Sequence, residues 1–382
     1  MVIQGRGVAQ LGSAPALGAG GRWFESSRPD QFSRGVSMLE QSRIWVLWTV
    51  VILMSGACNS STQTTTVDQT PNAQPNPYQV VGHSLKLPDG QELGWIMGVD
   101  IDLNGSDMWV FHTCGGGLQG CVGSTAVAPI AKFDTSGELV TSFGAGMFAH
   151  PHGLYVDHEG NIWALDGFGG SSSEQAEQGH QVFKFSPKGE LLLTLGTAGV
   201  KGNGPDTFYT PSDVLVAPNG DIFVADGHGG DMNDRIVKFD KEGNFIKAWG
   251  TKGSEPGQFN NTHSLAMDSE GRLFVGDRAN LRIQIFDQNG QFLDEWYQFG
   301  APSEVFIDED DVIYVADSIS DEQTNPDFLK GIRIGNAKDG TLTSFIPDLD
   351  PSTLQELVVA DSSGNVWGGH LSGRMVKRFV RD

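Results

Sequence analysis

The sequence predicts an all-β protein, a six-bladed β-propeller, from three observations. A unit of four short runs, each alternating apolar and polar residues and joined by tight turns, occurs twice in succession between residues 208 and 300. Similar units recur along the chain without any long segment of helical periodicity, and the 51 glycines suit a fold with many turns. Units of this length cannot bury their apolar faces alone, so the copies must pack side by side.

Six copies of the unit align on the turn between their first and second strands. The turn residue is glycine in five copies and aspartate in one, and an apolar strand follows it each time. These anchor residues are Gly105, Gly160, Gly220, Gly271, Asp311 and Gly364. Six anchors predict six blades, which together occupy residues 78–382.

The last copy, residues 356–382, contains only three strands. The unmatched run at residues 78–87, ahead of the first copy, alternates in the same way. We therefore predict that this N-terminal strand completes the last blade and closes the ring. Closure of this kind leaves no long free sheet edge.

Two segments at the start of the chain lie outside any blade pattern. Residues 1–37 have no core pattern and resemble a translated transfer-RNA gene, so we place the true start at Met38. Residues 38–57 combine a basic residue with the apolar run Ile44–Met54, which is too short to span a bilayer and is typical of a signal peptide.

The end of the predicted signal peptide, Ser55-Gly56-Ala57-Cys58, resembles a bacterial lipobox. It predicts lipidation at Cys58 and an exported lipoprotein of the cell envelope, facing the periplasm or the exterior. Ordinary cleavage beside an unmodified cysteine is the alternative. Residues 58–77 are polar and rich in Ser, Thr, Gln and Pro, which predicts a disordered tether.

The composition limits the classes of binding partner, and the cysteines indicate whether the protein resides in an oxidising compartment. A formal net charge of −22 argues against nucleic acid, and against a membrane contact other than the lipid anchor. We expect a monomer that acts on a small molecule or a peptide. Of the three cysteines, Cys114 and Cys121 share one Gly-rich loop. In an exported chain this spacing predicts a disulfide, with a metal-binding pair as the alternative.

The strands nearest the propeller axis offer the candidate chemistry. Counting back eight residues from each anchor gives the equivalent position in every blade: Met97, His152, Ser212, His263, Ser303 and Glu356. The two histidines and the glutamate fall on alternate blades, so they surround the axis evenly. Such a set with an open fourth position is typical of catalytic zinc, whereas channel residues that bind only water are the alternative.

The repeats resemble NHL repeats, and residues 93–382 resemble bacterial propellers related to peptidyl-α-hydroxyglycine α-amidating lyase. The matching runs are PHGL (151–154), HQVFKF (180–185), ADG (225–227) before RIVKF, THSL (262–265) and DR (277–278). The resemblance implies an enzyme containing zinc and calcium that releases an amidated peptide and glyoxylate. It also implies His152 and His263 as zinc ligands, the Leu154 carbonyl as a calcium ligand and Arg278 as a substrate-binding residue.

The chain departs from the animal lyases at four functional positions. Glu356 replaces the third zinc histidine, Leu357 a calcium aspartate, His228 the catalytic tyrosine and Thr113 an arginine. A shell of two histidines and a glutamate still suits zinc, and His228 is expected to act as the catalytic base because its ordinary pKa lies near neutrality. Without the arginine, a bidentate clamp for a substrate carboxylate is lost.

Two function classes follow from these patterns. The first is an exported, metal-dependent lyase that acts on a small hydroxylated amide or peptide end. The second is a non-catalytic, surface-tethered propeller that binds a peptide, glycan or protein partner on the same face. A calcium-dependent lactonase fits less well, because its acidic metal set is missing from the channel positions. Metal content distinguishes the first two classes.

Overall fold

The computed structural model describes residues 70–382, except residues 83, 89, 119, 169–176, 230–232 and 351–353. The predicted start at Met38, the signal peptide, the lipidation site Cys58 and residues 58–69 of the tether lie outside the described residues. No helix among the described residues is long and apolar enough to cross a membrane.

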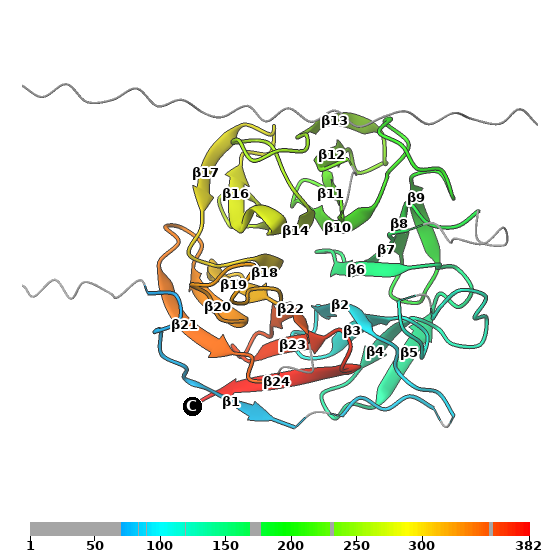
Figure 1. Ribbon diagram of the computed structural model, residues 1–382. Coiled ribbons are helices and arrows are strands. Elements are labelled where there is room, and N and C mark those ends of the chain that lie inside the picture. Colours follow the sequence, from blue (N-terminus) through cyan, green and yellow to red (C-terminus); the bar gives the residue numbers. More distant parts are fainter. Residues whose placement is uncertain are drawn as a thin grey trace, which may run out of the picture. The chain divides into compact units, whose positions relative to one another are not determined.

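Six four-stranded antiparallel sheets are arranged in a ring, which confirms the predicted six-bladed propeller (Figure 1). The first three blades are β2 (Ile96–Ile101), β3 (Met108–His112), β4 (Ile130–Phe133) and β5 (Leu139–Phe143); β6 (Pro151–Val156), β7 (Ile162–Asp166), β8 (Gln181–Phe185) and β9 (Leu191–Leu195); and β10 (Pro211–Val216), β11 (Ile222–Asp226), β12 (Arg235–Phe239) and β13 (Phe245–Trp249). The last three are β14 (Thr262–Met267), β15 (Leu273–Asp277), β16 (Arg282–Phe286) and β17 (Phe292–Trp296); β18 (Pro302–Ile307), β19 (Val312–Asp317), β20 (Gly331–Asn336) and β21 (Leu342–Pro347); and β22 (Gln355–Ala360), β23 (Val366–His370), β24 (Met375–Arg381) and β1 (Tyr78–Val81).

The N-terminal strand closes the ring as predicted. Strand β1 pairs antiparallel with β24, with Tyr78 opposite Arg381 and Val81 opposite Arg378. It therefore supplies the outermost strand of the sixth blade. Residues just before it also contact the propeller: the Asn72 side chain accepts hydrogen bonds from Arg333 and from the Leu329 backbone. The segment assigned to a tether thus contacts blade five from Asn72 onward.

All six anchor residues have a left-handed backbone. Their φ angles range from 59° at Asp311 to 90° at Gly220. Residues with a Cβ adopt this region only at a cost, which explains glycine at five of the six positions. Aspartate is among the residues best able to replace glycine there, so the one departure still fits the turn.

The apolar core lies between neighbouring blades. Between blades one and two, Phe111 meets Phe148 edge to face at 4.8 Å between ring centroids, and both are fully buried. Burying each such side chain stabilises the fold by roughly 1.5–3 kcal/mol. Every blade shares such clusters with its neighbours, so the ring holds the inner strands in fixed positions around the axis.

Aspartates at the end of the second strand of blades two to five fix the loop that enters the same blade. Asp166 accepts backbone hydrogen bonds from Ala149, His150 and Gly179. Asp226, Asp277 and Asp317 accept equivalent bonds from the loops of their own blades. These carboxylates therefore have a structural role, because they satisfy backbone amides and position the start of each inner strand.

Candidate functional site

The predicted channel residues occupy a β-bulge in every blade. The inner strands β2, β6, β10, β14, β18 and β22 each lose register with their neighbour at that point, as where Thr262 opposes Asp277 but Ser264 opposes Gly276. His263 and Glu356 are the single residues left unpaired on their strands, and on β6 both His152 and Gly153 are unpaired. A bulge re-aims the side chain it leaves unpaired, which brings these residues toward the axis.

Three histidines meet at this site. His152 and His263 come from the bulges of blades two and four, and His228 comes from the loop that follows β11. Their ring centroids lie 4.6 Å (His152–His228), 4.8 Å (His228–His263) and 5.4 Å (His152–His263) apart. Each histidine offers one ring nitrogen within 4.8 Å of those of the other two, close enough to share one metal ion.

Backbone carbonyls fix the orientation of the two bulge histidines. Nδ1 of His152 lies 2.8 Å from the carbonyl oxygen of Ser212, and Nδ1 of His263 lies 2.5 Å from that of Ser303. A carbonyl only accepts hydrogen bonds, so Nδ1 carries the proton and Nε2 keeps a free lone pair. Metal-binding histidines are oriented in this way by their surroundings.

The site keeps all three imidazoles neutral. Burial disfavours the charged ring and lowers the pKa of His152 to about 3, with His263 and His150 adding to the effect. Burial and the neighbouring histidines hold the pKa of His228 well below its usual range, and burial together with Arg278 lowers that of His263. Neutral imidazole is the form that binds a metal.

Glu356 and Arg278 form an ion pair beside the histidines. Oε1 of Glu356 lies 2.5 Å from Nη1 of Arg278 and 3.4 Å from Nε2 of His263. Burial alone would raise the Glu356 pKa, but the interaction with the nearby His263 ring and the Arg278 charge outweigh it and lower the pKa to about 2. Nη2 of Arg278 lies 3.3 Å from Nε2 of His228. The site thus brings together all five residues expected from the sequence.

The residues present fit a metal ion. Nε2 of His263 and Nδ1 of His228 are buried and have no hydrogen-bond partner among the described residues. An unpaired buried nitrogen costs about 1–3 kcal/mol, which a bound cation would offset. A small cavity of about 10 Å³ lies against His152, His263 and Glu356, with room for one ion or water. Imidazole nitrogens with a carboxylate oxygen are ligands that zinc prefers.

The side chains at the predicted calcium position, Leu154 and Leu357, carry no oxygen that could bind the ion. Leu154 follows the bulge of β6, and its side chain packs in the core between blades one and two. The Leu357 side chain packs in the core between blades six and one. Calcium binds through oxygen, so neither side chain contributes, and the Leu154 carbonyl stays a predicted ligand.

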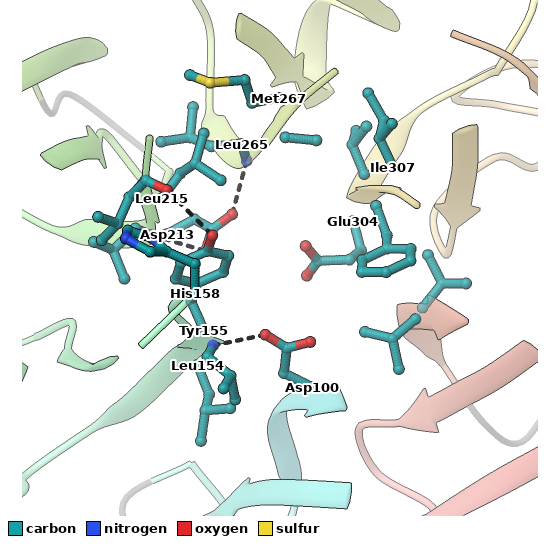
Figure 2. A pocket seen from close by; sticks show the side chains of 18 of the residues that line it. Asp100, Leu154, Tyr155, His158, Asp213, Leu215, Leu265, Met267, Glu304 and Ile307 are labelled. Atoms are coloured by element: carbon teal, nitrogen blue, oxygen red, sulfur yellow. Dashed lines mark hydrogen bonds between the residues drawn. The ribbon is translucent and has the colours of Figure 1, made fainter. Parts of the chain in front are cut away.

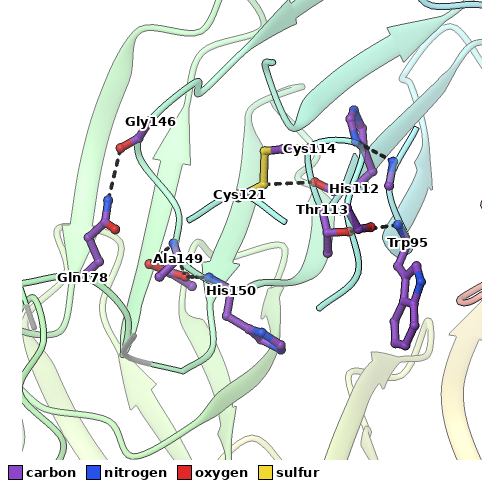
Figure 3. Close-up of a disulfide and its surroundings, with 12 residues drawn as sticks. Trp95, His112, Thr113, Cys114, Cys121, Gly146, Ala149, His150 and Gln178 are labelled. Atoms are coloured by element: carbon purple, nitrogen blue, oxygen red, sulfur yellow. Dashed lines mark hydrogen bonds between the residues drawn. A yellow bond between two sulfur atoms is a disulfide. The ribbon is translucent and has the colours of Figure 1, made fainter. Parts of the chain in front are cut away.

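Thr113 is part of the disulfide loop. Its hydroxyl donates to the Gly116 carbonyl at 2.8 Å and accepts from the Trp95 backbone amide at 2.9 Å (Figure 3). Cys114 and Cys121 form the predicted disulfide in the same loop. Thr113 is fully buried, so this position offers no charged group to a substrate.

An aromatic wall beside the histidines is a feature that the sequence did not indicate. His150 stacks near His152, with centroids 6.3 Å apart, and meets Phe168 edge to face at 4.7 Å. Phe168 in turn lies 5.9 Å from His228. His150 and His152 lie two positions apart near the start of β6, but nothing local to Phe168 in the sequence distinguishes it from other loop residues. The residues that follow Phe168 in this loop, 169–176, lie outside the described residues.

The chain is similar in sequence to NHL-repeat proteins and to amidating enzymes. No protein-family model matches the chain. NHL repeat-containing protein 3 from Homo sapiens is 30% identical over 239 residues, which cover 60% of this chain and 66% of that protein. A probable peptidyl-α-hydroxyglycine α-amidating lyase from Caenorhabditis elegans is 32% identical over 214 residues, 51% of this chain and 56% of that protein. Peptidyl-glycine α-amidating monooxygenase B from Xenopus laevis is 33% identical over 260 residues, 63% of this chain and 27% of that protein. The matches thus span less than two thirds of each relative.

Solved structures support the fold. A gluconolactonase from Xanthomonas campestris superposes with a TM-score of 0.53 at 13% identity, covering 80% of this chain and 95% of that one. Virginiamycin B lyase from Staphylococcus aureus gives a TM-score of 0.50 at 15% identity, covering 79% and 84%. At such identities the similarity concerns the propeller fold alone.

Proposed function

We propose that this chain, a six-bladed propeller with homologues among NHL-repeat proteins and peptidyl-α-hydroxyglycine α-amidating lyases, is a metal-dependent lyase. Its substrate is a small hydroxylated amide or the α-hydroxyglycine end of a peptide. The observation that carries the proposal is the convergence of His152, His228 and His263 on one point, with two of the rings oriented by backbone carbonyls.

We assign His152, His263 and Glu356 as the zinc ligands. All three sit on equivalent bulges of alternate blades, and the 3.4 Å between Nε2 of His263 and Oε1 of Glu356 lets both atoms face one ion. His228 lies within reach as well, but it comes from a loop and its Nε2 contacts the Arg278 guanidinium, so we assign it to proton transfer. Zinc, when bound, supplies a Lewis acid that polarises a substrate oxygen.

The reaction proposed is cleavage of the bond between the hydroxylated carbon and the amide nitrogen. The α-hydroxyl group loses its proton, its oxygen becomes the carbonyl of glyoxylate, and the amide nitrogen leaves and gains a proton. His228 accepts the hydroxyl proton at a ring nitrogen. Because burial and the neighbouring histidines hold its pKa well below the usual range, His228 does not retain that proton and returns it to the departing nitrogen.

Arg278 orients the substrate in this proposal. Its Nε is buried without a partner, while Nη1 and Nη2 contact Glu356 and His228. The guanidinium therefore lies between the proposed ligand and the proposed base, where it can hold a substrate oxygen with respect to both. With Thr113 in place of an arginine, a substrate carboxylate meets only this one guanidinium, which favours small or weakly charged substrates.

The test is turnover of an N-acyl-α-hydroxyglycine by the zinc-loaded protein, followed as release of glyoxylate. We expect glyoxylate and the primary amide in equal amounts, and none from the His152→Ala variant. A zinc-loaded protein that binds the compound without cleaving it would favour the alternative, a propeller that binds peptide ends without chemistry.

A further inference from the structure

A second, larger cavity lies in the channel beyond the histidine site. Its volume is about 470 Å³, within the range of small-molecule sites. Its lining residues follow the bulge residue along each inner strand, as Leu154, Tyr155 and Val156 follow His152 on β6. Among the described lining residues, only Glu304 borders both this cavity and the small one at the histidines.

The wall of this cavity is apolar and contains two aromatic rings. Most lining side chains are Leu, Val, Ile, Met or Ala. Tyr155 and Phe306 occupy equivalent positions on blades two and five, five residues before their anchors. The Tyr155 hydroxyl donates to the Val216 carbonyl at 3.3 Å, which fixes the ring. Such walls suit an apolar ligand body, and aromatic faces attract cations.

Three carboxylates enter the cavity from alternate blades. Asp100, Asp213 and Glu304 belong to blades one, three and five, and their carboxyl groups are directed toward the centre of the cavity (Figure 2). Each accepts a short hydrogen bond: from the Val156 amide at 2.7 Å, the Leu265 amide at 2.7 Å and the Ser264 hydroxyl at 2.8 Å, respectively. These donors position the carboxylates but are uncharged.

The carboxyl groups of the cavity have no cationic partner among the described residues of its lining. No lysine or arginine is among the described residues that line it, and His158 at the rim is exposed. Burial accordingly raises the pKa of Asp100 and Asp213 to about 7 and that of Glu304 well above its usual range. A ligand that brings positive charge would relieve this cost.

We propose that this cavity binds an organic cation, a quaternary or protonated amine on an apolar body. The apolar walls suit the apolar body of such a ligand, and the aromatic rings and carboxyl groups suit its positive charge. The volume of the cavity suits a small molecule. A single metal ion fits less well. The three carboxylates do not form a group with all donor atoms within 4.8 Å, whereas the histidines do. The proposal concerns the opposite end of the inner strands and does not depend on the lyase function.

The test uses three aromatic probes of similar size and different charge. Benzyltrimethylammonium is the cation and has no lone pair to offer a metal, 2-phenylethanol is neutral, and 3-phenylpropionate is an anion. Titration calorimetry at pH 8 should show one site for the cation, with affinity at least about tenfold above that for either other probe. Equal affinity for the cation and the alcohol, or no binding of the cation, would overturn the proposal.

Two variants locate the site. Glu304→Gln keeps an acceptor for the Ser264 hydroxyl but cannot ionise to meet a bound cation, so it should weaken cation binding by about tenfold and leave the neutral probe unaffected. Ile307→Trp fills part of the cavity and should weaken every probe. Glu322→Gln, an exposed acid outside the lining, is the matched control and should change nothing. Unchanged cation affinity in both Glu304→Gln and Ile307→Trp would contradict the proposal. So would a wild-type protein that binds Ca²⁺ in a manner dependent on Glu304 but does not bind benzyltrimethylammonium. The zinc content of each variant reports whether the histidine site is intact.

Discussion

The Arg278 guanidinium lies 2.5 Å from the Glu356 carboxylate, although the two residues are 78 positions apart in the sequence. Arg278 follows β15 in blade four, and Glu356 occupies the bulge of β22 in blade six. The pair is nearly buried, so removing one partner leaves an uncompensated charge. We propose that Arg278 anchors the substrate and that Glu356 binds the metal. Substituting one residue at a time should therefore affect turnover and zinc binding differently.

Arg278→Ala should retain zinc and lose at least about 100-fold in turnover, because the substrate loses its anchor while the metal ligands remain. The metal-free variant should also unfold at lower temperature, since Glu356 is left without its cation. Added zinc should therefore raise the melting temperature of Arg278→Ala more than that of the wild type. An equal or smaller rise would contradict a Glu356 carboxylate that faces the metal.

His152→Ala and His263→Ala should each weaken zinc binding by at least about 100-fold, because two remaining ligands form a much poorer site. Equilibrium dialysis against a zinc buffer measures the change. The matched control is His158→Ala, an exposed histidine at the rim of the other cavity, which should bind zinc like the wild type. If either variant binds zinc as tightly as the wild type, the histidine substituted in that variant is not a zinc ligand.

Glu356→Gln and His228→Ala decide the third ligand. We expect Glu356→Gln to weaken zinc binding, because a charge that faces the cation is lost, and His228→Ala to keep zinc while losing turnover. Zinc stoichiometry and glyoxylate release measured on the same preparations separate the two effects. The reverse pattern, with zinc lost from His228→Ala and kept in Glu356→Gln, would make the three histidines the metal shell.

Ring closure should dominate the stability of the propeller. A protein that starts at residue 70 keeps β1, whereas one that starts at residue 82 loses it and exposes the edge of β24. The second should melt at least about 5 °C lower than the first and aggregate more readily. Equal melting temperatures by differential scanning calorimetry would show that β1 contributes little to the closed ring.

The disulfide is consistent with the predicted export of the protein, which can be tested at Cys58. Disulfides persist in oxidising compartments, and Cys114–Cys121 is formed here. If Cys58 is lipidated, the mature protein should partition with membranes, and Cys58→Ser should release it or leave the signal uncleaved. Mass spectrometry of the purified protein tests this directly, and detection of residues 1–37 would contradict both the start at Met38 and the signal peptide.

The blade pattern could be predicted from the sequence because its repeats fix it locally. The anchor turns need a left-handed residue, so glycine marks five of them, and the count of eight residues leads to the bulge in every blade. Both features depend on backbone geometry that each unit repeats. The sequence alone therefore predicts that His152, His263 and Glu356 lie at the channel.

The contacts that do not repeat could not be predicted in this way. The Arg278–Glu356 pair joins a residue that follows β15 in blade four to the bulge of β22 in blade six. The second cavity was missed because strand alternation turns successive side chains to opposite sides. The bulge breaks that alternation: Ser303 lines no part of the cavity, but Glu304, the next residue, faces the channel at both of its cavities. Asp213 follows the bulge residue Ser212 in the same way.

The zinc content of the protein tests the central claim most directly. We expect elemental analysis of protein purified without chelator to give about one zinc per chain, because the ring fixes the ligand spacing before the metal arrives. After removal of the metal, titration calorimetry should restore one equivalent in the wild type and none in the His152→Ala, His263→Ala double variant. A protein that is isolated metal-free and shows no heat of zinc binding would contradict the account and leave a propeller that binds its partners without a metal.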